Sequence, residues 1–171
     1  MRRLPIGPGS NLLGYHVNAQ VGVAAGPLLN SKWVEGYARL GFDVLTYSTV
    51  RSRFQPALSL PNIRHVETRE QFAVAPRRHA NGSPTIAIST GIPSMEPEIW
   101  RKDMRRAKER LSPGQILIAS VMGTPDPDGN PEGLIADYTR CAVWAAEAGA
   151  DVIEVHLATP SPFGEPGQMV Y

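Results

Sequence analysis

Apolar runs and amphipathic stretches alternate along the chain. Four mostly apolar runs, rich in β-branched residues, lie near residues 21–25, 43–48, 116–121 and 152–157. Runs of this length without strict alternation are typical of parallel strands that are buried on both faces. We therefore expect the four strands to be parallel neighbours in the order in which they occur in the sequence.

Amphipathic stretches between these runs have the spacing of helices. Asn30 or Ser31 can cap a helix that continues to Leu40 and ends at Gly41. Two further stretches place apolar side chains on one helical face. These side chains are Trp100, Met104, Ala107 and Leu111 in the first stretch, and Leu134, Tyr138, Cys141, Ala145 and Ala148 in the second. The alternation of strands and helices predicts an α/β protein with a parallel sheet.

The stretch 51–84 departs from this alternation. It is rich in arginine and proline and shows no long hydrophobic period. We interpret it as an excursion from the α/β core that can hold a short hairpin and that ends in a strand at 85–89.

Composition is that of an ordinary globular protein. Of 171 residues, 42% are hydrophobic and 19% are charged, so we expect a single domain over residues 1–171. The formal net charge of +1 gives no field that would recruit nucleic acid or an anionic membrane surface. The chain has one cysteine, no apolar signal core after its first residues, and no run near the roughly 20 apolar residues of a membrane span. These features indicate a cytoplasmic protein in which Cys141 is a packed thiol.

The stretch 151–162 points to a site. An apolar strand there runs directly into a turn that carries hydroxyl groups and is closed by proline. Because ligands bind at the carboxyl ends of parallel strands, the side chains from His156 to Ser161 are expected to face a pocket. His156 either contacts a ligand or is a histidine satisfied at the mouth of the strand, and its position favours the first interpretation. The remaining histidines lack metal-ligand spacing, so no metal site is expected.

Five short motifs occur in order along nearly the whole chain. They read VAAG at 23–26, GF at 41–42 leading to TYST at 46–49, STGIP at 89–93, SVMG at 120–123, and EVHLATPS at 154–161. In this order and spacing the chain resembles the dihydroorotate dehydrogenase family. The members of that family are FMN-containing (β/α)8 barrels. The resemblance implies a TIM-barrel type of fold with about the first four βα units and an N-terminal hairpin present, which is the N-terminal half of such a barrel.

The resemblance also implies a function and a cofactor site. It implies an FMN-dependent oxidoreductase that passes hydride between a small-molecule substrate and the flavin, acting on CH–CH bonds. The small residues Ala24, Ala25 and Gly26 would let a flat flavin ring approach the backbone closely. Ser48 and His156 would provide polar contacts to the flavin.

The last motif departs from the family's pattern. Thr159 stands where the family has its proton-abstracting cysteine or serine, so the resemblance makes Thr159 the catalytic candidate. The asparagines that hold the pyrimidine ring correspond to Ile88, His156 and Ser161, of which Ser161 is the substrate-binding candidate. Without these amide groups, the buried donors and acceptors of a dihydropyrimidine would go unpaired. We therefore expect a substrate other than dihydroorotate.

Two functions from different classes remain open. The first is a flavoenzyme acting on another ring or unsaturated bond, and the second is a non-catalytic half-barrel fragment or a subunit that needs a complementing chain. In such barrels the cofactor phosphate commonly binds at loops after strands seven and eight, so we expect the isolated chain to bind FMN weakly or not at all. Open sheet edges favour self-association or pairing with a complementing barrel half. No Gly-x-Gly-x-x-Gly motif follows a strand, which argues against a nicotinamide cofactor.

Overall fold

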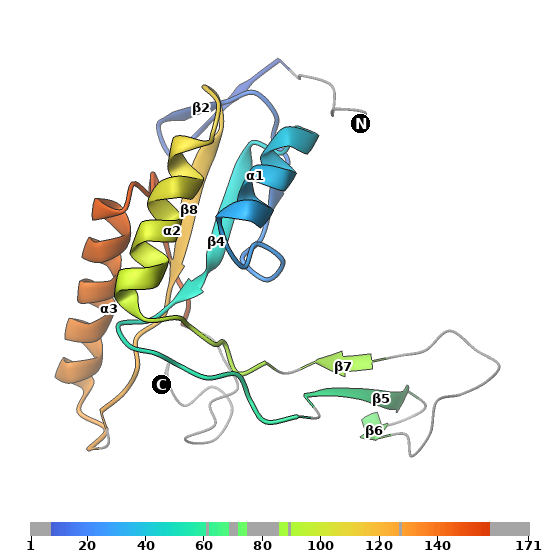
Figure 1. The fold of residues 1–171 in the computed structure, drawn as a ribbon, viewed down its shortest axis with the longest axis vertical. Helices are drawn as coiled ribbons and strands as arrows, with labels where there is room; N and C mark the ends of the chain where they lie inside the picture. The colour runs from blue at the N-terminus through green and yellow to red at the C-terminus, as the bar shows by residue number, and fades with distance from the viewer. Residues whose placement is uncertain are drawn as a thin grey trace.

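A parallel sheet forms the centre of the molecule (Figure 1). The computed structural model describes residues 8–60, 62–68, 72–74, 86–88, 90–126 and 128–157. Within them, four strands pair in the order β3-β4-β8-β9, and all neighbours are parallel. Their bounds are Gly22–Val23 for β3, Val44–Val50 for β4, Ile116–Val121 for β8 and Val152–Val155 for β9. The predicted strands, their order and their direction are confirmed.

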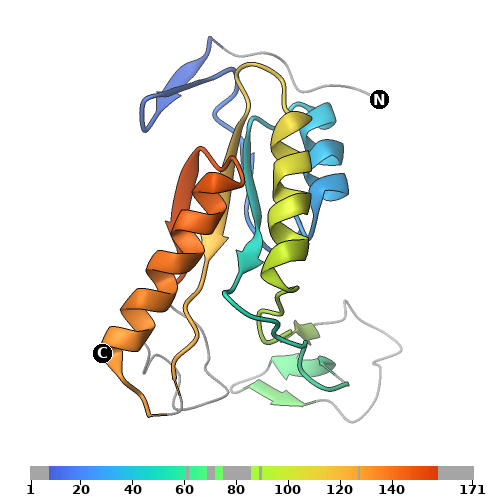
Figure 2. The same ribbon diagram turned by 60° about the vertical axis from the view of Figure 1, so that its left-hand side comes forward.

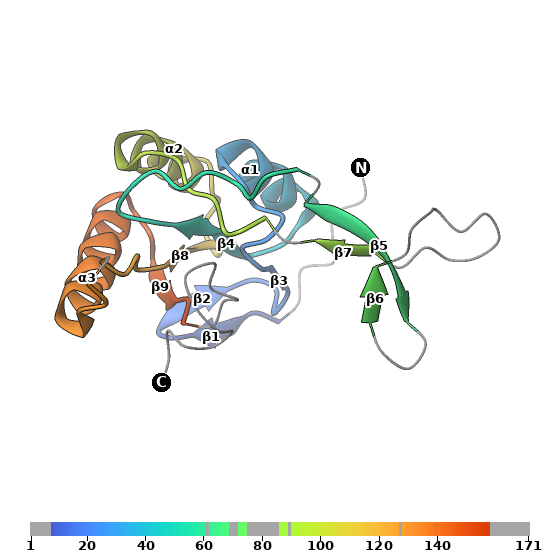
Figure 3. The same ribbon diagram turned by 90° about the horizontal axis from the view of Figure 1, so that it is seen from below.

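Three helices in the described part of the chain cover one face of this sheet (Figures 2 and 3). They are α1 (Ser31–Leu40), α2 (Pro97–Glu109) and α3 (Pro131–Glu147). Their predicted apolar faces pack on the sheet. Trp100, Met104, Ala107, Cys141, Ala145 and Ala148 are each no more than 2% exposed, and they contact Leu45, Leu117, Ala119 and Val121 of the central strands. Full burial of a large apolar side chain stabilises a fold by about 1.5–3 kcal/mol, so this layer is the main source of stability.

The N-terminal hairpin lies at the end of the sheet where the parallel strands begin (Figure 1). Strand β1 (Ser10–Leu12) pairs antiparallel with β2 (Tyr15–Val17), as the resemblance implied. The backbone of Asn18 donates to the carbonyl oxygen of Gly114 at 3.2 Å. This bond joins the hairpin to the turn that leads into β8.

The excursion after β4 is more ordered than the sequence indicated. Strands β5 (Ile63–Thr68), β6 (Phe72–Val74) and β7 (Ile86–Ile88) form an antiparallel sheet in the order β6-β5-β7. The expected hairpin and final strand are present, but the pairing of β5 with β7 was missed. The stretch that holds β5 and β6 shows no long hydrophobic period, so the partners of these strands could not be read from the sequence. The sheet projects from the end where the parallel strands finish (Figures 1 and 2).

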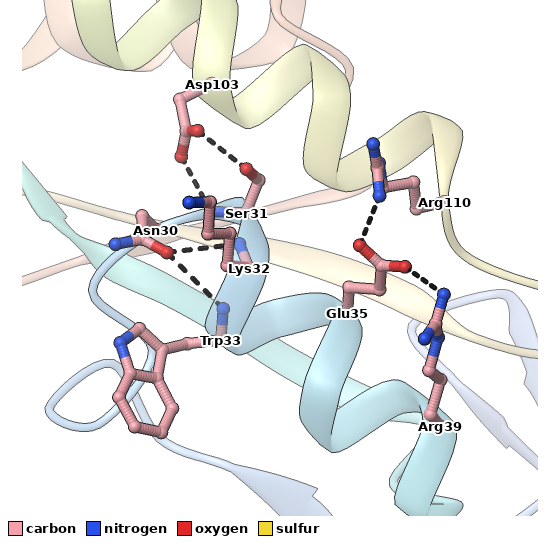
Figure 4. A network of polar contacts seen from close by, with 8 residues as sticks. All are labelled: Asn30, Ser31, Lys32, Trp33, Glu35, Arg39, Asp103 and Arg110. Atoms are coloured by element: carbon pink, nitrogen blue, oxygen red, sulfur yellow. Dashed lines mark hydrogen bonds and ion pairs between the residues drawn. The ribbon is translucent and has the colours of Figure 1, made fainter.

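Two adjacent polar residues at the start of α1 form hydrogen bonds with different partners (Figure 4). The side chain of Asn30 accepts hydrogen bonds from the backbone of Lys32 at 3.1 Å and Trp33 at 3.4 Å, so Asn30 is the N-cap. Ser31 instead donates from its backbone and its hydroxyl to the two carboxylate oxygens of Asp103, each at 2.6 Å. Asp103 lies on α2, so this carboxylate joins the two helices. Gly41 ends α1 at a φ of 98°, a conformation that glycine adopts without strain.

Helix α2 also forms ion pairs with the elements on its other side. Arg101 lies 2.8 Å from Glu147 of α3, and its guanidinium lies 5.4 Å from the ring centre of Trp144. Lys108 contacts Asp151, the residue before β9, at 2.5 Å. Such partly exposed pairs contribute only about 0.2–1 kcal/mol each, so they orient α2 rather than hold the fold together.

Candidate functional site

A cavity of about 760 Å³ lies where strands β3, β4 and β9 end. Its volume is within the range of about 300–1,000 Å³ that is usual for small-molecule sites. Residues of two chain segments, 54–57 and 90–95, form most of the rest of the described wall, and Leu29 and Trp100 complete it. The site therefore has the position expected for a ligand of a parallel α/β protein.

The residues predicted to bind a cofactor come together in this cavity. Ala24, Ala25 and Gly26 follow β3, Ser48 lies in β4, and His156 follows β9, and all five line the same wall. They come from three segments that are far apart in the sequence. Their convergence follows from the strand order, and their role towards a cofactor stays a prediction.

Three other positions that were matched to family site residues are not part of the described cavity wall. The catalytic candidate Thr159 and the substrate candidate Ser161 lie outside the described residues. Ile88, at a position of a family asparagine, lies on β7, is 58% exposed and is not part of the described cavity wall.

A shift of strand register presents the end of β4 to the cavity. The pairing of β4 with β8 is regular up to Tyr47 and shifts before Val50. Such irregularities re-aim side chains at the ends of strands. As a result, the consecutive residues 47–50 all contribute to the cavity wall. The hydroxyl of Thr49 also lies 2.9 Å from that of Ser120, which is fully buried in β8.

Tyr47 lies in β4 and contacts the helical layer. Its hydroxyl donates to Asp103 at 2.7 Å, and the ring is only 3% exposed. Burial, and then the hydrogen bond to Asp103, raise the pKa of Tyr47 well above its usual value, so its hydroxyl stays neutral. Among the described residues of the wall none is lysine or arginine, and Glu154 is the only acidic residue. This wall therefore has no ammonium or guanidinium group to meet a negatively charged ligand.

Tyr138 holds the backbone that carries His156. The Tyr138 hydroxyl donates to the carbonyl oxygen of His156 at 2.7 Å, and the amide of His156 donates to Val121 at 2.9 Å. The phenol reaches this position because Gly123 has no side chain; a Cβ added there would lie 2.5 Å from the Tyr138 ring. Sequence reasoning placed Tyr138 on an apolar helical face and missed this bond. The available signal was that a buried tyrosine hydroxyl usually has a partner.

Arg51 is the other polar residue that sequence reasoning missed. It is only 5% exposed, and burial lowers the pKa of its guanidinium. Its Nε donates to the carbonyl oxygen of Ile92, and its Nη1 donates to the carbonyl oxygen of Gly123 and the hydroxyl of Thr124, each at 3.2 Å. Its Nη2 lies 3.0 Å from the sulfur of Met122. Nothing in the hydrophobic pattern of the irregular stretch 51–84 distinguishes this arginine from its neighbours.

The cysteine has the role expected of it. Cys141 is fully buried in α3, and burial raises the pKa of its thiol to about 12. A thiol of this kind is not ionised near neutral pH and is a poor nucleophile.

Comparisons with known proteins agree with the motifs. No known family model matches the chain. The chain is 32% identical, over 174 aligned residues, to the dihydroorotate dehydrogenase of Dictyostelium discoideum; the match covers 94% of this chain and 46% of that protein. The chain thus spans about half the length of the curated relative that it matches.

Two solved structures share the fold. A ligand-free dihydroorotate dehydrogenase from Eimeria tenella matches with a TM-score of 0.64 and 18% identity, over 96% of this chain and 41% of that one. The same enzyme in complex with ferulenol matches with a TM-score of 0.57 and 18% identity, over 89% and 36%. These comparisons confirm the resemblance to the dihydroorotate dehydrogenase family, and the part matched corresponds to its N-terminal half. In the described residues, no helix has both the length and the apolar character needed to cross a membrane.

We predict that Tyr138→Phe weakens the strand end that carries His156. Loss of one hydrogen bond should lower the free energy of unfolding by about 1 kcal/mol, because the His156 carbonyl loses its partly buried donor. Urea denaturation measures this change. Tyr37→Phe is the matched control, since the Tyr37 ring packs on Phe42 and no described residue bonds its hydroxyl. Equal losses in the two variants would contradict the assignment.

Proposed function

We propose that this chain provides the flavin-ring site of an FMN-dependent oxidoreductase with a TIM-barrel fold. One observation carries the proposal. The five residues that the family resemblance assigns to the cofactor lie around one cavity at the carboxyl ends of the parallel strands. The size of the cavity suits a three-ring cofactor.

The described wall fits the ring of FMN better than its phosphate. Ala24 and Ala25 leave room for a flat ring, and a Cβ added to Gly26 would meet no protein atom within 4 Å, so the backbone there is open to the cavity. Ser48 and His156 add polar groups. The absence of lysine and arginine from the described wall leaves no ammonium or guanidinium group for the phosphate. When bound, FMN would supply hydride transfer, and this chain would hold the ring in place.

The Glu154 side chain in the cavity wall affects which substrates the cavity can bind. Dihydroorotate carries a carboxylate, and Glu154 would repel it in a cavity where no described lysine or arginine offsets the repulsion. The amide groups that would clamp a dihydropyrimidine are also missing at His156 and Ser161. Both features support a substrate other than dihydroorotate, one that is uncharged at the position facing Glu154.

A flavin titration tests the proposal. Riboflavin, which lacks the phosphate, should bind the purified chain with a dissociation constant on the order of 100 μM, and FMN should bind no more than about threefold tighter. Fluorescence anisotropy of the flavin measures both. Ala25→Phe should abolish binding by filling the cavity, whereas Ala136→Phe, on the exposed face of α3, should not. Riboflavin binding that is absent, or that survives Ala25→Phe, would refute the proposed site.

We also propose that Thr159 is the proton-transfer residue, because it stands at the family's cysteine or serine position. In the flavin-loaded enzyme, Thr159→Ala should slow reduction of the flavin by substrate by roughly 100-fold or more, the usual contribution of a positioned acid or base. Thr159→Ser keeps the hydroxyl and should retain most of the rate. Stopped-flow absorbance measures the rate, and flavin content serves as the control. Full-speed reduction in Thr159→Ala would show that the proton leaves by another route.

Self-association, or pairing with a complementing barrel half, is a further part of the proposal. Val155 and Leu157 are 50% and 48% exposed at strand β9, and no described strand pairs with the outer edge of β9. An edge of this kind favours association. Light scattering on the purified chain should give a mass above that of a monomer. A monomer at about 100 μM would argue against association of this strength.

A further inference from the structure

One wall of the cavity is made by two segments joined as a ladder. The amide of Gln55 donates to Ser94, and the amide of Ser94 donates to Gln55, each at 2.9 Å. The amide of Leu58 donates to Thr90, also at 2.9 Å. This ladder is the neck between the parallel sheet and the projecting sheet (Figure 1). We call residues 54–57 and 90–95 the neck wall.

Arg51 lies at the base of the neck wall and joins it to the end of β8. Its backbone amide donates to the Ser94 hydroxyl at 3.0 Å, and its Nε donates to the Ile92 carbonyl. The same guanidinium donates through Nη1 to Gly123 and Thr124, which follow β8. One side chain therefore fixes the distance between the neck wall and the central sheet.

The backbone that Arg51 holds is strained. Ile92 has a φ of 51°, in the left-handed region that β-branched residues avoid. Such a conformation persists only where the surroundings over-determine it, and it is found most often at binding sites. Ile92 lines the cavity, and its carbonyl oxygen is an acceptor of Arg51.

The guanidinium is costly to bury in this way. No described carboxylate accepts a hydrogen bond from Arg51; its described acceptors are carbonyl oxygens, a hydroxyl and a sulfur. A buried charge with no hydrogen-bonded opposite charge lowers stability, and the attraction of the nearby Asp137 is smaller than the effect of burial, so an apolar side chain would serve better as mere filling. The carbonyl groups that Arg51 holds in place offer a reason for its presence.

We propose that Arg51 is a positioning residue that holds the neck wall in its ligand-binding shape by fixing the strained backbone of Ile92. The identity of the ligand rests on the function proposed above. The restraint that Arg51 places on the neck wall does not rest on that function, because it is a property of the chain without ligand.

Amide hydrogen exchange on the ligand-free chain tests the restraint. In Arg51→Met, the amides of Gln55 and Ser94 should exchange at least about tenfold faster relative to the amide of Ala119 in β8, because the neck opens locally. Arg51→Lys keeps the charge but loses the planar fork of donors, so it should show the same change. It replaces Arg51→Met in the experiment if Arg51→Met does not fold. Arg53→Met is the matched control, since Arg53 is exposed and, among the described residues, its side chain bonds only to the Pro125 carbonyl.

A second substitution separates positioning from simple packing. Glycine adopts the left-handed conformation without strain, so Ile92→Gly added to the Arg51 variant should slow the exchange of Ser94 again by about threefold or more. If Arg51 only fills space, Ile92→Gly will make the neck looser and the exchange faster. Unchanged exchange in both Arg51 variants, or no recovery with Ile92→Gly, would overturn the proposal.

Riboflavin binding links the restraint to the site. Arg51→Lys should weaken binding by about tenfold, Arg53→Met should leave it unchanged, and Ile92→Gly should restore part of the loss. If the unmodified chain binds no riboflavin, the flavin site is refuted while the exchange data still decide the role of Arg51. If riboflavin binds equally well to Arg51→Lys, the positioning role is overturned while the flavin site stands.

Discussion

The parallel pairing of β4 with β8 is the constraint on which the rest of the structure depends. These two strands lie in the middle of the four-stranded sheet, and Leu45, Leu117 and Ala119 on one face are covered by the described helices. Parallel strands all finish at the same edge, so the pairing alone brings the end of β3, the register shift of β4 and the end of β9 around one space. The side of the cavity formed by the strand ends is thus a product of strand direction, and the hydrogen bonds between Gln55 and Ser94 hold the opposite segments together.

Periodicity was enough to predict the sheet and its helices, because the mostly buried central strands β4 and β8 form long apolar runs and the helices have clear apolar stripes. It could not choose between Asn30 and Ser31 as the N-cap, since both residue types can accept backbone hydrogen bonds. The choice depends on Asp103, which is 72 residues from Ser31 in the sequence and engages the Ser31 hydroxyl. The pairing of the short strands β5 and β7 was hidden for a similar reason, as it joins segments that carry little pattern of their own.

The candidate site, like the fold, was predicted only in part from the sequence. The small residues at 24–26, Ser48 and His156 were found because strand ends and motifs identify them. The groups that hold the site, Tyr138 and Arg51, were missed, because their importance lies in single bonds to distant carbonyl oxygens. The bond from the Tyr47 hydroxyl to Asp103 in the helical layer was missed for the same reason, because it joins residues 56 positions apart in the sequence.

The neck between Gln55 and Ser94 separates the parallel sheet, whose structure the cavity depends on, from the projecting sheet, whose length is free to change. Its hydrogen bonds close the excursion into a loop whose ends stay fixed, whatever lies between them. The entropy of closing a loop rises only slowly with its length, so residues could be gained or lost beyond the neck at little cost to the core. Evolution could therefore reshape the projecting sheet, and with it the approach to the cavity, without moving the parallel strands. Differences in chain length among related proteins should therefore be found mainly in the projecting sheet.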